Sequence, residues 1–263
     1  MRELSINNNS KLFALLLNIY NPKENFEITK NYFKSENPSD LIHSAQKTDC
    51  DILALRFNVL SLDELSEAVS LLRALLPYIT KPLMICGTGK KEIDEKLLPE
   101  LMKVLDREQC IISFATENTY KSILPSVIAG NHYVVLKTPI DINLAKELNI
   151  LSVDMGLSLD KIIMNTDIGG LGYGYEYGYS MMEKVKLESP KDDYLSFPII
   201  SEASVESLKT KEARFDNFPD SWGELLKRAE MIELSSCAGA IAAGANIVVV
   251  NNPESIKFLR ELV

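Results

Sequence analysis

The chain has 263 residues, 46% of them hydrophobic and 25% charged, which predicts a globular protein with one large core. The formal net charge of −9 argues against a surface for nucleic acid or for an anionic membrane, because neither attracts an acidic protein. No apolar run reaches the roughly 18 residues of a membrane-spanning helix and no signal-peptide pattern opens the chain, so we expect a cytoplasmic location.

Short apolar segments alternate with polar or amphipathic stretches along the chain, which is the pattern of parallel strands joined by helices. Asn37 and Pro38 are expected to open one helix, and Asp141 is expected to cap another. Residues 21–36 and 203–220 are interpreted as polar connections. Buried strands are expected at 12–20, 51–57, 81–86, 109–116, 132–137, 161–165, 197–201 and 246–250.

Eight strands in alternation with helices predict a closed (β/α)8 TIM barrel. No linker rich in Pro, Gly or Ser divides the chain, so residues 1–263 are expected to form a single domain. An open doubly wound sheet is the alternative architecture. It has less support, because no G-x-G-x-x-G follows the first strand to indicate a dinucleotide-binding fold.

Residues 163–179 form the most unusual segment, because a buried strand runs directly into five glycines spaced among four tyrosines. Glycine permits positive φ and lets another molecule approach the backbone, and tyrosine supplies a flat amphipathic surface. A barrel places such a loop at the carboxyl end of a strand, where functional residues gather. A turn that only joins strand to helix is the alternative. The candidate ligand-contact residues at this end are Asp141, Asn143, Asn165, Asp167, Gly170, Leu171, Gly172, Tyr173, Gly174 and Glu202.

Neither the cysteines nor the histidines indicate a metal site. The cysteines do not pair at C-x-x-C spacing, so neither zinc nor an iron–sulfur cluster is expected, and buried free thiols are the preferred interpretation. His43 is expected on a helix surface, and His132 at the start of a strand, on the stability face of a barrel. No D-x-H-x-x-G histidine loop, with which many cobalamin domains ligate cobalt, is present. The cysteines are Cys50, Cys86, Cys110 and Cys237.

The loop 87–89 after the third strand, Gly-Thr-Gly, is a second place where a ligand can bind. Its backbone can cradle an anion, although Lys90 and Lys91 beside it are equally well interpreted as solvated residues. A barrel enzyme that acts on phosphorylated substrates is a poor match, because the loops after the seventh and eighth strands lack a Gly-rich phosphate site.

The segment 139–177 carries a specific pattern: P-I-D-I-N, then A-K-E-L-N-I-L at 145–151, then G-L-G-Y-G-x-E-Y at 170–177. Further matches in order and spacing include F-P-I-I at 197–200 and A-A-G-A-N at 242–246. Together these segments resemble the small (delta) subunit of the corrinoid/iron–sulfur protein of the acetyl-CoA pathway. The T-T-G-A, G-x-G-N and Trp-Glu segments of that family are represented here by 167–170, 87–90 and Ile232-Glu233.

The resemblance implies a TIM barrel that acts as an accessory, non-catalytic subunit. A large partner subunit of that family holds an iron–sulfur cluster and most of the contacts to a corrinoid. The corrinoid carries a methyl group between a methyltetrahydropterin methyltransferase and acetyl-CoA synthase. The carboxyl-end loops of the small barrel face the corrinoid and help to cover it, and this chain is expected to hold no iron–sulfur cluster itself.

Two other functions remain open. A pterin-dependent methyltransferase of the related barrel class would hold its pterin with an acidic residue and asparagines at strand ends. A repurposed copy of the subunit would bind a different small molecule. The polar residues available for a pterin are Asn58, Asp141, Asn143, Asn165, Asp167 and Asn251.

Overall fold

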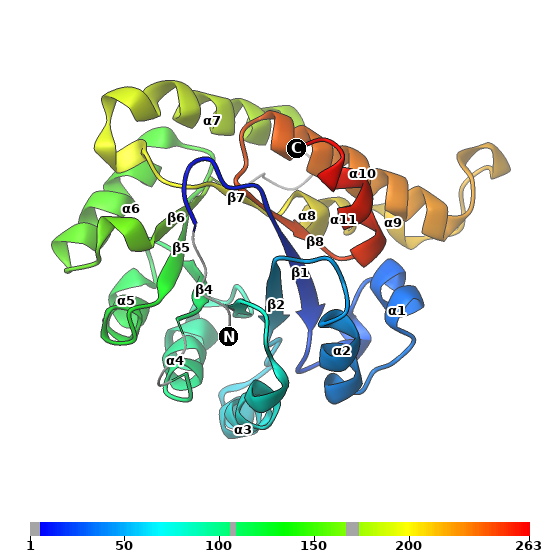
Figure 1. The fold of residues 1–263 in the computed structure, drawn as a ribbon, viewed down its shortest axis with the longest axis horizontal. Coiled ribbons are helices and arrows are strands. Elements are labelled where there is room, and N and C mark those ends of the chain that lie inside the picture. Colours follow the sequence, from blue (N-terminus) through cyan, green and yellow to red (C-terminus); the bar gives the residue numbers. More distant parts are fainter. Residues whose placement is uncertain (1–5, 106–108, 167–173) are drawn as a thin grey trace.

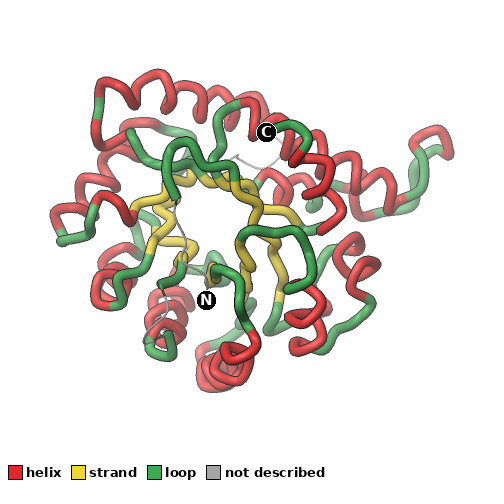
Figure 2. The backbone as a smooth tube through the Cα atoms, in the orientation of Figure 1, coloured by secondary structure: helices red, strands yellow, loops and turns green. Residues whose placement is uncertain are grey.

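A computed structural model describes residues 6–105, 109–166 and 174–263 and has a ring of parallel strands inside a layer of helices (Figure 1). The tube view shows the same arrangement, with the strands as an inner ring (Figure 2). The strands are β1 (Leu12–Asn18), β2 (Ile52–Arg56), β3 (Leu83–Cys86), β4 (Ile111–Ala115), β5 (Tyr133–Lys137), β6 (Ile162–Asn165), β7 (Ile200–Ser201) and β8 (Ile247–Val250).

The strands follow the order β6-β5-β4-β3-β2-β1-β8-β7, and every paired neighbour is parallel. A parallel bridge between Met164 and Ile199 joins the two ends of this order, and the Met164 amide donates a hydrogen bond to the Pro198 carbonyl at 2.8 Å. The ring is therefore closed, which confirms the predicted TIM barrel and rules out the open sheet.

Helices cover the outside of the ring, and two expected connections contain helices that the sequence did not reveal. Residues 21–36 hold η1 (Pro22–Glu24) and α1, and residues 203–220 hold α8 and α9. The prediction that these two segments are polar connections was therefore wrong. The helices are α1 (Glu27–Phe33), α2 (Pro38–Ala45), α3 (Leu65–Leu75), α4 (Lys91–Met102), α5 (Tyr120–Ala129), α6 (Ile142–Asp154), α7 (Tyr175–Glu188), α8 (Ala203–Ser207), α9 (Lys211–Arg214), α10 (Leu225–Ala242) and α11 (Pro253–Arg260).

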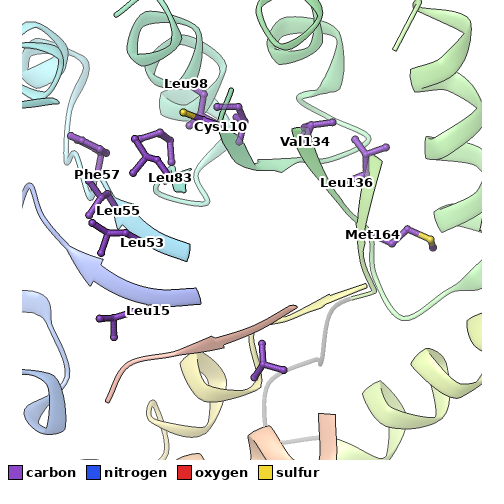
Figure 3. Packing of buried hydrophobic residues seen from close by; sticks show 14 of the residues in the cluster. Leu15, Leu53, Leu55, Phe57, Leu83, Leu98, Cys110, Val134, Leu136 and Met164 are labelled. Atoms are coloured by element: carbon purple, nitrogen blue, oxygen red, sulfur yellow. The ribbon is translucent and has the colours of Figure 1, made fainter. Parts of the chain in front are cut away.

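The strand residues alternate between two hydrophobic layers. In β1, Phe13 and Leu15 pack outward against the helices, while Ala14 and Leu16 fill the inside of the barrel. Figure 3 shows the outer layer, in which Leu15, Leu53, Leu83 and Val134 belong to one buried cluster. Because both faces of each strand are buried, the sequence shows continuous apolar runs.

The four cysteines are free and buried, as expected. The expected caps are also present: the Asn37 side chain accepts from the amides of Ser39 and Asp40, and Asp141 accepts from those of Asn143 and Leu144. Across the described ranges, no helix is long and apolar enough to cross a membrane.

Candidate functional site

Glu202 lies at the centre of the carboxyl-end face, directly after β7. Its Oε1 atom lies 3.5 Å from Nη2 of Arg56, the last residue of β2, and its Oε2 atom lies 3.4 Å from Nζ of Lys137, the last residue of β5. Oε2 also accepts a hydrogen bond of 3.1 Å from Nδ2 of Asn165, the last residue of β6. The closed ring thus brings together four side chains from distant parts of the chain.

The electrostatics of this cluster keep Glu202 ionised. Burial by itself raises the pKa of a carboxyl group, but the charges of Lys137 and Arg56, with the hydrogen bonds from Lys137 and Asn165, hold the pKa of Glu202 below its usual value. Lys137 Nζ also lies 4.8 Å from the centre of the Phe114 ring. An anion held by two cations is a fixed polar surface, and it is poorly suited to donate a proton at neutral pH.

A hollow of about 510 Å³ opens beside this cluster, at the carboxyl ends of β1, β2 and β3. One wall comes from η1 and α1 and the other from α8 and α9, the helices that the sequence did not reveal. Asn18 is 9% exposed, and its Oδ1 atom finds no hydrogen-bond partner within the described residues. Polar side chains line most of the hollow, including Asn18, Asn25, Arg56, Asn58 and Thr88.

The loop after β3 does hold an anion, but the anion is a carboxylate of the protein itself. Asp94 of α4 accepts from the amide and hydroxyl of Thr88 at 2.8 and 2.9 Å, and from the amide of Gly89 at 2.7 Å. A side chain at position 87 would collide with this carboxylate, because a Cβ at Gly87 would lie 2.6 Å from Asp94 Oδ1. These donors are therefore already engaged.

Removing this carboxylate should loosen the loop. We expect Asp94→Ala to destabilise the protein by about 2 kcal/mol and to speed amide hydrogen exchange at Thr88 and Gly89 roughly tenfold, because three hydrogen bonds to a buried group are lost. Hydrogen-exchange mass spectrometry measures the effect. Glu92→Ala, an exposed acid in the same helical turn, serves as the control and should change neither quantity. Unchanged exchange at both amides in Asp94→Ala would contradict the role of Asp94.

The other expected ligand-contact residues are less closely grouped. Asp141 and Asn143 lie exposed at the start of α6, where the Asp141 side chain is engaged as a helix cap. Gly174 precedes α7 with φ of 86°, a conformation that favours glycine. The remaining residues, Asp167, Gly170, Leu171, Gly172 and Tyr173, lie outside the described residues.

A second buried carboxylate, Glu233 of α10, fixes the loop after β8. It is 0% exposed, and its Oε1 atom accepts from Ser204 Oγ at 2.5 Å and from the Asn251 amide at 2.7 Å. Its Oε2 atom accepts from Ser255 Oγ at 2.5 Å. The Asn251 side chain donates to Ser204 Oγ, so this asparagine belongs to the buried network. Asn251 is thereby a poor pterin ligand.

His132 lies away from the polar cluster, whereas Cys86 is the neighbour of Arg56 across β2 and β3. His132 precedes β5 at the opposite end of the barrel, and burial lowers its pKa to about 4. Cys86 ends β3, but its thiol packs in the barrel interior and burial raises its pKa to about 12. Within the part of the chain that the structure describes, no group of three or more His, Cys, Asp or Glu residues is arranged to hold a metal ion.

The sequence matches a family model described as CO dehydrogenase/acetyl-CoA synthase delta subunit over residues 8–251. The chain belongs to this delta subunit family. The match begins just before β1 and ends just after β8, so it includes every strand of the barrel. The family that the motifs at 139–177 indicated is thus confirmed.

Two curated relatives show the extent of the likeness. The acetyl-CoA decarbonylase/synthase complex subunit delta of Methanocaldococcus jannaschii is 28% identical over 197 residues, covering 74% of this chain and 48% of the relative. The subunit of the same name from Archaeoglobus fulgidus is 27% identical over 241 residues, covering 86% of this chain and 53% of the relative. The chain therefore spans about half the length of the curated relatives that it matches.

Solved structures of an enzyme, dihydropteroate synthase, share the fold of this delta subunit family member. The dihydropteroate synthase of Yersinia pestis with a sulfonamide drug superposes with a TM-score of 0.67 at 13% identity, covering 99% of this chain and 97% of the enzyme. At this level of identity, the likeness establishes the TIM-barrel architecture alone.

Proposed function

We propose that this chain is an accessory barrel subunit that covers and orients a corrinoid held mainly by a partner subunit. The observation that carries the proposal is the family match over residues 8–251, because it takes in the whole barrel and every strand end. The relatives are named as subunits of an acetyl-CoA decarbonylase/synthase complex, so a complex is the expected setting. The methyl group would pass between a methyltetrahydropterin methyltransferase and acetyl-CoA synthase.

The side chains at the carboxyl-end face fit a corrinoid. The rim of a corrin ring carries amide groups, which need both donors and acceptors of hydrogen bonds when water is removed. Arg56, Asn58, Lys137 and Asn165 supply donors, and Glu202 supplies acceptor oxygens. A bound corrinoid supplies a cobalt centre that can carry a methyl group. The task left to this chain is to exclude water and hold the ring in one orientation.

The positions of the cysteines and histidines favour a cover over a primary cobalt site. Cys86 is buried with a raised pKa, and His132 lies at the other end of the barrel. The large corrinoid/iron–sulfur subunit is therefore proposed as the partner that holds the cofactor. In the proposed surface Asn165 and Glu202 are joined by Asp141, Asn143, Gly174 and the glycine-rich loop, of which Asp167 and Gly170 to Tyr173 lie outside the described residues.

A paired titration tests this function. We expect the chain alone to retain cobalamin poorly, and the chain mixed with the large corrinoid-bearing subunit from the same source to form a complex that retains the corrinoid, followed by its absorption spectrum. Arg56→Ala should weaken the complex roughly tenfold, equivalent to about 1.4 kcal/mol, because Arg56 lies at the proposed contact surface. Arg73→Ala, on the exposed face of α3, is the matched control and should have no effect.

Two results would overturn the proposal. Tight binding of cobalamin to the chain alone would contradict a shared site. Tight binding of methyltetrahydrofolate to the chain alone would favour the pterin-dependent methyltransferase instead.

A further inference from the structure

The connection between α9 and α10 projects sideways from the barrel at the right of Figure 1. We call residues 215–226 the projection. It contains η8 (Asp220–Trp222) and leads into the first turn of α10. No strand of the barrel runs through it, and it does not contribute to the carboxyl-end cluster around Glu202. Its conformation is therefore not explained by the proposed corrinoid site.

One buried arginine holds the projection in place. Arg228 of α10 is 8% exposed, and its guanidinium donates to three carbonyl oxygens: Glu212 at 2.6 Å, Gly223 at 2.6 Å and Phe215 at 2.7 Å. It also lies 5.0 Å from the centre of the Phe218 ring. Three charge-assisted bonds to the two ends of a loop make it rigid, because the planar guanidinium fixes all three acceptors at once.

The rigid projection presents large apolar side chains to solvent. Trp222, the one tryptophan of the chain, is 52% exposed, Phe215 is 51% exposed, and Leu226 is 38% exposed. The Trp222 ring stacks on Phe218 with a centroid separation of 5.2 Å, so its orientation is set before any partner arrives. Exposed aromatic residues that are already ordered are typical of the residues that dominate protein–protein binding energy.

The projection itself carries only acidic charges, and the arginines next to it, Arg214 and Arg228, lie against the rings of Phe215 and Phe218. The projection contains Asp216, Asp220 and Glu224 and neither lysine nor arginine. Asp216 and Glu224 line a groove of about 590 Å³ between the projection and α1. The lysine in this groove, Lys30, already pairs with Glu27 at 2.9 Å. In the described parts of the chain, neither Asp216 nor Glu224 forms an ion pair. A partner surface that carries Lys or Arg beside an apolar depression would complement both features.

We propose that the projection is a docking surface for a partner subunit, whose contacting face is apolar at its centre and basic at its rim. The inference rests on the proposed function, because it takes the corrinoid-bearing large subunit as the occupant. The Trp222 side chain enters the apolar centre, and a basic side chain of the partner occupies the groove beside Asp216 and Glu224.

The experiment uses the whole chain and the large corrinoid-bearing subunit, with affinity measured by calorimetry. We expect Trp222→Ala to weaken the complex about tenfold or more, as is usual for a central aromatic contact. The double variant Asp216→Asn, Glu224→Gln should weaken it several-fold at low salt and flatten its salt dependence. Tyr78→Ala, at a 67%-exposed aromatic just before β3, is the matched control and should bind like the unaltered chain.

A second readout follows the docked side chain directly. Because the chain has one tryptophan, labelling it with 5-fluorotryptophan gives a single fluorine resonance, which should shift when the complex forms. Unchanged affinity of the Trp222→Ala and double variants, together with an unmoved resonance in a complex that does form, would overturn the docking proposal and leave the proposed function standing. If no complex forms with the large subunit, both proposals fail.

Discussion

Glu233→Ala is expected to lower the free energy of unfolding by about 3–5 kcal/mol, the largest effect of any substitution considered. Glu233 is 0% exposed, and its carboxyl accepts hydrogen bonds from Ser204 Oγ, Ser255 Oγ and the amides of Asn251 and Asn252. Alanine leaves two buried hydroxyls and two buried amides without this acceptor, and each unpaired group costs about 1–3 kcal/mol.

Thermal and urea unfolding would measure the loss. For a chain of this length, a loss of 3–5 kcal/mol corresponds to a fall in Tm of roughly 10 °C. The stability of Glu233→Gln should lie between that of the unaltered protein and that of Glu233→Ala, since one acceptor oxygen remains. The matched control is Glu230→Ala one turn earlier in α10, where the side chain pairs with a mostly exposed Lys227 and contributes little. Equal stability of the Glu233→Ala and Glu230→Ala variants would show that the buried network does not stabilise the barrel.

The hydrogen bonds of Glu233 also couple α10 to the residues that follow β7 and β8. Ser204 lies in α8, which follows β7, and Asn251 follows β8, and Glu233 joins both to α10. Glu202 is two residues before Ser204, so loosening this joint should also disturb the position of Glu202 on the carboxyl-end face. We therefore expect Glu233→Gln to bind the partner subunit more weakly, although Glu233 itself is buried and does not contact the partner.

The strands could be predicted from the sequence because burial on both faces leaves a strong local signal. The run 246–250 is apolar after Asn246, and the observed β8 (Ile247–Val250) differs from it by that one residue. The caps at Asn37 and Asp141 were predictable for a similar reason, since the side chain and the amides it accepts from are close in sequence.

The helices α1, α8 and α9 could not be predicted in this way. They have 7, 5 and 4 residues. A helix this short is not stable by itself, because nucleation is costly and few hydrogen bonds follow. Tertiary packing stabilises them: Ile28 of α1, Leu208 just after α8, Ala213 of α9 and Ala229 of α10 form one small buried cluster. Such contacts are between residues far apart in sequence and have no local pattern.

The candidate site was only partly predictable, for the same physical reason. Glu202 was found because a carboxylate directly after a buried strand is conspicuous, and Asn165 because it ends the strand before the glycine-rich loop. Their cationic partners Arg56 and Lys137 were missed. Each is the last residue of its strand, and a charge at the end of an otherwise apolar run is the signal that could have found them. The sequence does not show which strand ends face one another, because that depends on how the strands close into a ring.

The second large effect is a loss of stability in acid that depends on His132. This residue is 2% exposed, and its Nδ1 atom accepts a hydrogen bond of 3.3 Å from the Cys110 amide. Gly130 leaves room for the ring, because a Cβ there would lie 2.3 Å from His132 Nε2. The site therefore holds a neutral imidazole, and burial lowers the His132 pKa from 6.5 to about 4.

The direction of the pH effect follows from proton binding. Above pH 6.5 the imidazole is neutral in both the folded and the unfolded chain, so it causes no pH dependence. Between pH 6.5 and about 4, the unfolded chain binds a proton that the folded chain does not, and stability falls. A shift of this size corresponds to about 3 kcal/mol lost across that window.

His132→Gln isolates this contribution. Because the aspartates and glutamates titrate in both proteins, the difference between the two curves of unfolding free energy against pH reports His132. We expect the glutamine variant to be less stable at pH 7, since its side chain fits the space less well, yet to lose about 3 kcal/mol less between pH 6.5 and pH 4. His43→Gln, at an exposed position of α2, should follow the unaltered protein throughout. Parallel curves for His132→Gln and the unaltered protein would mean that the buried imidazole takes up its proton in the folded state, and that burial does not exclude the charge.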